Sequence, residues 1–139
     1  MKGVDSSLLI YALDPTTKEH AIARDSILSL ESWAINPTVV HEVYHTLVFK
    51  RGMKSIDGRS KLKAVLRDKR THFFNITKKM SLFSLDLAIE FGMGGRDSLI
   101  VGCYMTSGMD AVLTHDSSLL AMGNVRFRGR QIAFLDPLA

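Results

Sequence analysis

Apolar residues in this chain follow two patterns, short continuous runs and longer segments with helical spacing. The short runs, rich in residues that favour strands, predict β-strands at 2–4, 33–35, 72–76, 111–114 and 131–135. The helical spacing predicts helices over about 6–13, 19–31, 38–51, 55–70, 80–91 and 97–107. The three prolines, at 15, 37 and 137, stand at the ends of these segments and not inside them.

Short apolar strands that alternate with helices are typical of a parallel sheet covered on both faces. The expected fold class is therefore α/β, a three-layer sandwich with a central, mostly parallel sheet of about five strands flanked by helices. The length of 139 residues fits one domain, and no repeat, low-complexity stretch or linker divides it. We expect a single domain over 1–139.

Composition excludes several classes of protein. With 46% hydrophobic and 23% charged residues, the chain is of the globular type and not the disordered type. A single cysteine excludes an internal disulfide framework and a cysteine metal cluster, and it favours a reducing, cytoplasmic environment. The first residues lack the apolar core of a secretory signal, and no run approaches the roughly 18 apolar residues of a membrane span.

Four acidic residues stand where sheets of this class bind ligands, beyond the carboxyl ends of the strands. Asp5 follows the first strand, and Asp116 follows the strand at 111–114. Asp97 opens a helix after a glycine-rich approach, and Glu42 lies one turn into an otherwise apolar helix. Taken singly, Asp97 also suits a helix cap and Asp116 a turn. Their joint placement at one edge of the sheet indicates a common site.

Carboxylates that converge without a basic residue between them repel one another, and a divalent cation removes that conflict. Oxygen-only ligands favour Mg²⁺ or Mn²⁺ over zinc. Such a cation can activate water and stabilise the charge that develops on a phosphodiester. The sequence therefore predicts Asp5, Glu42, Asp97 and Asp116 as metal ligands and catalytic residues.

Four short motifs follow one another along the chain. They are Val4-Asp5-Ser6-Ser7-Leu8-Leu9-Ile10-Tyr11, Glu42-Val43-Tyr44, Arg96-Asp97-Ser98-Leu99-Ile100-Val101 and Leu113-Thr114-His115-Asp116. In this order they resemble the PIN domain family, most closely the small prokaryotic VapC-type toxins and their stand-alone relatives. The resemblance covers essentially the whole chain, and it implies the α/β fold and a metal-dependent endoribonuclease.

The resemblance also implies the details of a site and its partners. Acids matching Asp5, Glu42, Asp97 and Asp116 hold one or two Mg²⁺ or Mn²⁺ ions, and Ser7 and Thr114 match small polar positions that line such sites. The implied partners are an RNA substrate, a second copy in a homodimer and, for toxin members, a small antitoxin protein. One departure is Leu119-Leu120, where the family often has an aromatic residue; we expect no loss of chemistry from it.

The predicted helix that carries Glu42 also contains a zinc-peptidase motif. His41-Glu42-Val43-Tyr44-His45 matches H-E-x-x-H, in which two histidines one turn apart bind zinc and the glutamate is the general base. A catalytic zinc needs a third protein ligand, and the H-x-x-G-x-x-H extension does not follow. A metallopeptidase using His41, Glu42 and His45 remains the alternative enzyme, and a PIN-fold binding module with little turnover is the alternative outside catalysis.

Basic residues are concentrated in one part of the chain. The formal net charge is +4, from 18 Lys and Arg against 14 Asp and Glu, and 11 of the 18 lie between Lys50 and Lys79. This segment, together with Arg96 beside Asp97, predicts contacts to an anionic partner, with Lys50, Arg51 and Arg96 as candidate RNA-binding residues. A solvated helix face explains the same run equally well.

Overall fold

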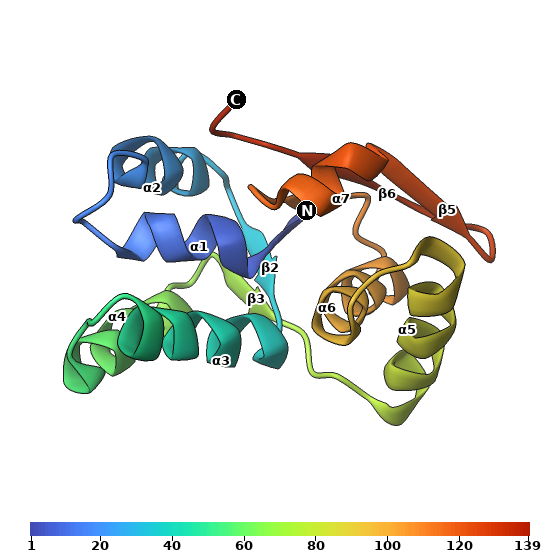
Figure 1. The fold of residues 1–139 in the computed structure, drawn as a ribbon, viewed down its shortest axis with the longest axis horizontal. Helices are drawn as coiled ribbons and strands as arrows, with labels where there is room; N and C mark the ends of the chain where they lie inside the picture. The colour runs from blue at the N-terminus through green and yellow to red at the C-terminus, as the bar shows by residue number, and fades with distance from the viewer.

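The computed structural model describes all residues, 1–139, as a central sheet between layers of helices (Figure 1). In Figure 1, α1, α2 and α4 lie to the left of the sheet, and α5 and α6 lie to its right. The elements in chain order are β1 (Lys2–Val4), α1 (Ser6–Leu13), α2 (His20–Leu28), β2 (Trp33–Ile35), α3 (Pro37–His45), the π-helical turn η1 (Thr46–Lys50), α4 (Ser55–Arg67), β3 (Thr71–Phe73), α5 (Lys78–Phe91), α6 (Gly95–Thr106), β4 (Ala111–Leu113), α7 (Ser117–Met122), β5 (Asn124–Phe127) and β6 (Arg130–Leu135).

The sheet has six strands in the order β3-β2-β1-β4-β6-β5. All neighbouring strands are parallel except β5, which runs antiparallel to β6. The predicted three-layer α/β fold is therefore confirmed, with one strand more than the expected five. Because chain order reverses at β1, which pairs with β2 on one side and β4 on the other, the carboxyl ends of β1 and β4 flank the topological switch point. None of the helices has the length and apolar character to cross a membrane.

The structure adds two elements and shifts the starts of several helices, among them α3 and α6. The sequence pattern did not predict α7 or β5; β5 forms a hairpin with β6 through a turn in which Arg128 and Gly129 have positive φ. Helix α3 begins at Pro37, one residue before the predicted start, and is capped by Asn36, whose side chain accepts a hydrogen bond from the Val39 amide. Helix α6 already begins at Gly95, so Asp97 lies in its first turn and does not cap it.

Tyr104 of α6 connects the right-hand helix layer to the central strands. Its fully buried hydroxyl donates to the carbonyl oxygen of Val4 at 2.6 Å, and the carbonyl oxygen of Ala34 lies 3.1 Å away. The aromatic ring packs on Gly3, where a Cβ atom would lie 2.5 Å from Tyr104 Cδ2. Glycine at position 3 is what allows α6 to pack this closely against β1, directly before Asp5.

Replacing Gly3 by Ala should lower the free energy of unfolding by about 1–3 kcal/mol, because the added methyl group overlaps the Tyr104 ring. Urea unfolding measures the change. Gly95→Ala is the matched control, since a Cβ atom there meets open space and the position is helical. Equal stabilities of the two variants would show that the Tyr104 ring moves aside without cost.

Candidate active site

The four predicted acids lie around the carboxyl ends of β1 and β4. Asp5 directly follows β1, Asp116 precedes α7, Glu42 is on α3, and Asp97 is in the first turn of α6. Burial, followed by the charges of Asp5, Asp116 and Glu42, raises the pKa of Asp97 to about 6. The charges of the other three acids therefore all reach Asp97.

Asp5 is held by two hydroxyl groups. Its Oδ2 accepts a hydrogen bond from Thr114 Oγ1 at 2.7 Å and another from Ser7 Oγ at 2.9 Å. The same hydroxyl oxygens accept backbone N–H groups, Ser7 from His115 and Thr114 from Asp116. Ser7 and Thr114, both predicted to support the site, thus fix the carboxylate of Asp5 and the loop that follows β4.

The second carboxylate oxygen of Asp5 has no partner. Asp5 is 2% exposed, and its Oδ1 atom is buried without any hydrogen bond. Burial raises the pKa of Asp5 in spite of the Thr114 and Ser7 hydrogen bonds, because a buried negative charge is costly without a counter-charge. An unpartnered carboxylate oxygen beside three other acids is a donor set that suits a hard divalent cation.

The other carboxylates are partly engaged elsewhere. Glu42 Oε1 accepts a hydrogen bond from Ser6 Oγ, and Oε2 lies 3.4 Å from Arg96 Nε. Asp116 Oδ1 accepts the amides of Ser118 and Leu119 and so caps α7, which leaves Oδ2 free. In this arrangement no three acidic, histidine or cysteine side chains form a preformed metal-ligand group. Binding a cation therefore requires side-chain rotation, above all of Glu42.

Comparison with known proteins identifies the family to which this fold belongs. The PIN domain model matches residues 3–125. This chain belongs to the PIN domain family. Solved structures with the same fold include VapC20 of Mycobacterium tuberculosis, a sarcin-ricin loop cleaving toxin, with a TM-score of 0.75, 16% identity and coverage of 92% of this chain and 99% of that one.

Two further structural neighbours are parts of toxin–antitoxin complexes. DNA-bound VapBC from Salmonella typhimurium matches with a TM-score of 0.70 and 14% identity, over 99% of this chain and 98% of that one. VapBC2 from Rickettsia felis, bound to a promoter DNA fragment, matches with a TM-score of 0.68 and 14% identity, over 97% of each chain. No curated protein sequence matches the chain significantly.

In this PIN domain the H-E-x-x-H motif does not form a zinc site. His41 and His45 are both exposed, and His45 stacks on Phe49 with ring centroids 5.2 Å apart. No third ligand joins them. Glu42 instead faces Ser6 and Arg96, on the side of α3 that belongs to the acidic site.

The three candidate RNA-binding residues have different surroundings. Lys50 is exposed at the end of η1. Arg51 pairs with the buried Asp14 at 3.1 Å and lies over the Tyr11 ring, which indicates a structural role. Arg96 stands at the acidic site, where it contacts Glu42.

Sequence reasoning missed two groups at this site. Ser6 is buried and donates to Glu42, and the sequence motif did not distinguish it from Ser7 beside it. His115 Nδ1 lies 3.1 Å from Asp136 Oδ2 and packs edge-on against Tyr11. Ser6 was detectable as a hydroxyl in the first turn after Asp5, whereas Asp136 carried no signal because it reaches the site only through the pairing of β6 with β4.

The raised pKa of Asp97 leads to a stability prediction. Between about pH 4 and pH 6 the folded chain keeps a proton on Asp97 that the unfolded chain releases, so the free energy of unfolding falls as pH rises through this window. Metal-free Asp97→Asn should therefore be more stable than the unsubstituted protein by about 1 kcal/mol at pH 7.5, after discounting for solvent screening. At pH 4 the two should be nearly equal.

Urea unfolding in the presence of a chelator, at both pH values, measures this difference. A variant that is less stable than the unsubstituted protein at pH 7.5 would show that Asp97 is not under charge repulsion in the metal-free state.

Proposed function

We propose that this protein is a metal-dependent endoribonuclease that cleaves RNA phosphodiesters as the toxin of a toxin–antitoxin pair. The observation that carries the proposal is the buried Asp5, with one unpartnered carboxylate oxygen, at the switch point of a PIN domain, together with the charges of Asp5, Asp116 and Glu42 that act on Asp97. Mg²⁺ or Mn²⁺, one ion or two, is the expected cofactor, held by Asp5, Glu42, Asp97 and Asp116. VapC20, described as a sarcin-ricin loop cleaving toxin, supports RNA as the substrate.

A divalent cation at this site supplies Lewis-acid stabilisation and activation of water for attack on the phosphodiester. The chain's own residues prepare the site for it. Ser7 and Thr114 fix Oδ2 of Asp5 and leave Oδ1 available to a cation, and Asp97, whose pKa is about 6, would contribute a carboxylate that is ionised at neutral pH. The basic segment from Lys50 to Lys79 attracts the RNA backbone.

A mixed pool of single-stranded RNA, incubated with the protein and Mn²⁺ or with excess chelator, tests this function. We expect cleavage with Mn²⁺, products with 5′-phosphate and 3′-hydroxyl ends, and none with chelator. RNA binding without cleavage under any metal would favour the binding module. Zinc-dependent cleavage of a protein substrate without RNA cleavage would favour the metallopeptidase.

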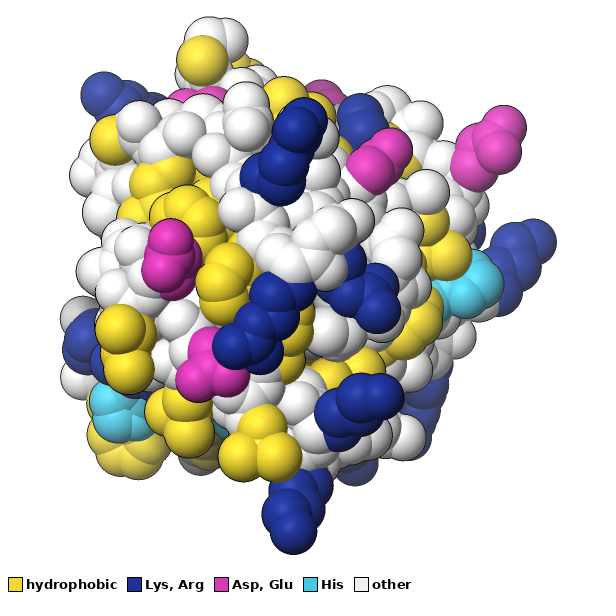
Figure 2. Space-filling view, turned by 90° about the vertical axis from the view of Figure 1, so that its right-hand side faces the viewer, with side chains coloured by type: hydrophobic (Ala, Val, Ile, Leu, Met, Phe, Trp, Pro, Cys, Tyr) yellow, Lys and Arg dark blue, Asp and Glu magenta, His cyan; other side chains and the backbone are white.

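We also propose that a second copy of the chain covers the outer face of α5. Leu82, Leu85 and Ile89 are spaced along one side of this helix and are between 58% and 85% exposed. Figure 2 shows hydrophobic side chains mixed with acidic and basic ones on this face of the molecule. Lys78 and Lys79 begin α5 and Glu90 stands near its end, so antiparallel packing of two copies brings opposite charges together.

Chemical cross-linking tests this homodimer. Around a two-fold axis near its middle, α5 places Leu85 against its own copy, and Leu82 against Ile89 of the other copy. Leu85→Cys should therefore form an intermolecular disulfide, without interference from the buried native Cys103. Ile56→Cys, equally exposed on α4, is the matched control. Sedimentation as a monomer, with no cross-link through position 85, would contradict the proposal.

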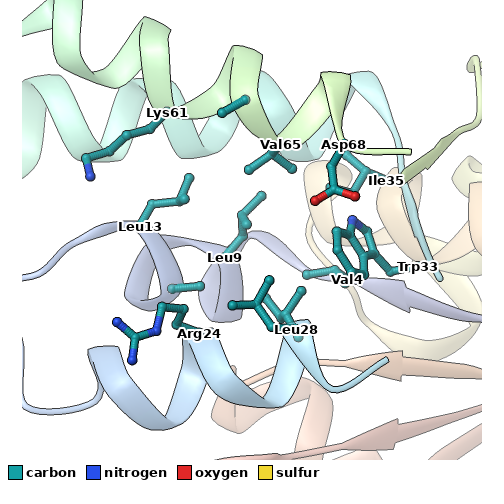
Figure 3. Close-up of a pocket in the computed structure, with 13 residues that line it drawn as sticks. Val4, Leu9, Leu13, Arg24, Leu28, Trp33, Ile35, Lys61, Val65 and Asp68 are labelled. Carbon is teal, nitrogen blue, oxygen red and sulfur yellow. The ribbon is translucent and has the colours of Figure 1, made fainter. Parts of the chain in front are cut away.

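The antitoxin is the third proposed partner, and an apolar groove is its expected docking site. A cavity of about 250 Å³ lies between α1, α2, α4 and β2, with Leu9, Leu13, Leu28 and Val65 in its walls (Figure 3). Trp33 also lines it, and the indole N–H is buried without a hydrogen-bond partner. The groove suits an apolar helical segment that brings one hydrogen-bond acceptor, and the VapBC complexes support an antitoxin as its source.

Co-expression with any small protein that is encoded directly beside this gene tests the pairing. Trp33 is the only tryptophan, so a shift of its fluorescence on complex formation reports occupation of the groove. Leu13→Glu should weaken the complex, while Ile56→Glu, exposed outside the groove, should leave it intact. A complex that forms with unchanged Trp33 fluorescence would place the antitoxin elsewhere.

A further inference from the structure

Arg96 is the basic residue whose charge acts on the acidic site. Its Nε atom lies 3.4 Å from Glu42 Oε2, and its charge lowers the pKa of the neighbouring Asp97 against the effect of the carboxylates. It stands in the first turn of α6, where the helix dipole disfavours a cation. Helix stability therefore does not explain an arginine here, whereas charge balance at the acidic site does.

The contact between Arg96 and Glu42 is easily broken. The Arg96 side chain is 71% exposed, and a single long contact to a carboxylate is a weak interaction in water. An exposed side chain held by one such contact can leave Glu42 at little cost.

Glu42 is the carboxylate most affected by this contact. Ser6 donates to one of its oxygens and Arg96 lies against the other, so both Glu42 oxygens already have a partner and the Arg96 charge opposes a cation there. Asp5, in contrast, offers a free oxygen, and Asp116 has a free Oδ2. Releasing Arg96 from Glu42 is thus the step that completes the ligand set.

We propose that Arg96 is an exchangeable counter-ion. It neutralises Glu42 in the metal-free protein, leaves when a divalent cation takes over Glu42, and then turns its guanidinium to a phosphate of the bound RNA. Guanidinium groups bind phosphate through paired N–H donors, so the released side chain has a suitable new partner. The identities of the cation and of the phosphate rest on the proposed function, but the competition between Arg96 and a cation for Glu42 does not.

Calorimetry with Mn²⁺ alone tests the competition. Arg96→Gln should bind Mn²⁺ about five- to tenfold more tightly than the unsubstituted protein, because one repelling and competing charge is removed. Arg96→Lys, which retains the charge, should stay near the unsubstituted value. Arg126→Gln, an exposed arginine on β5, controls for the change in net charge. Unchanged or weaker Mn²⁺ binding by Arg96→Gln would overturn the proposal.

A double-mutant cycle in the metal-free state tests the contact itself. Arg96→Gln should lower the melting temperature by about 1–3 °C, and the same change in a Glu42→Gln background should have no effect. Equal shifts in both backgrounds would show that Arg96 does not act through Glu42.

The RNA assay tests the second half of the exchange. Arg96→Gln should reach half-maximal cleavage at a lower Mn²⁺ concentration, yet show a several-fold higher KM for RNA. A KM equal to that of Arg126→Gln would overturn the phosphate contact. If no RNA is cleaved at all, the proposed function fails, while the calorimetric result still decides whether Arg96 competes with the cation.

Discussion

Asp97→Asn should abolish metal-dependent RNA cleavage, with kcat reduced by about 10³-fold or more. The substitution keeps the shape of the side chain but removes one of the four carboxylate charges that we propose hold the cation. The variant should also lose Mn²⁺ affinity in calorimetry. Because we expect metal-free Asp97→Asn to be more stable than the unsubstituted protein at pH 7.5, unfolding cannot account for the lost activity.

His45→Ala is the matched control for this experiment, since His45 is exposed and stacks only on Phe49. It should retain metal-dependent cleavage. The reverse pattern, with activity lost in His45→Ala and kept in Asp97→Asn, would overturn the nuclease in favour of the peptidase. Glu42→Gln does not separate the two enzymes, because both use Glu42.

Arg51→Met should destabilise the protein by about 2–3 kcal/mol. Asp14 is buried, and removing Arg51 leaves its carboxylate with hydrogen bonds from Thr16 alone. Burial raises the pKa of Asp14, but the hydrogen bonds from Thr16 and the contact with Arg51 together outweigh this effect. The pKa of Asp14 is therefore below its usual value. This contribution to stability is present above the unfolded pKa of about 4 and is lost as pH falls through the folded value.

Urea unfolding at pH 7 and pH 3 measures the effect of Arg51→Met, which should shrink at the lower pH. Lys50→Met, an exposed neighbour, is the control and should change stability by less than about 0.5 kcal/mol. If Arg51→Met is fully stable at pH 7 and impaired only in RNA binding, Arg51 is an RNA contact and not a structural residue.

Local signals in the sequence predict most of this fold. The runs at 2–4 and 33–35 coincide with β1 and β2, because short apolar strands buried on both faces leave a strong pattern. Helix α7 and strand β5 escaped prediction for different reasons. Helix α7 has six residues and depends on the Asp116 cap, whereas β5 is an edge strand with alternating exposure whose pairing with β6 is a tertiary property.

The candidate site is predictable as a set of residues but not as an arrangement. Asp5, Glu42, Asp97 and Asp116 follow from their positions relative to strands and helices. Their present partners do not, because Ser6 and Arg96 approach Glu42 from other elements only once α1, α3 and α6 have packed. For Arg51, the charge alone led to the prediction of an RNA contact. Its ion pair with Asp14 is visible only in the folded chain.

The central position of β1 has a consequence during synthesis. This strand is made well before its neighbour β4, which lies more than a hundred residues later, and the Thr114 hydrogen bond to Asp5 spans 109 positions. A nascent chain therefore carries Asp5 for most of its translation without the residues that orient it. Pairings so distant along the chain form late. A ribosome making this protein is accordingly not exposed to an assembled acidic site until synthesis has passed β4 and Thr114.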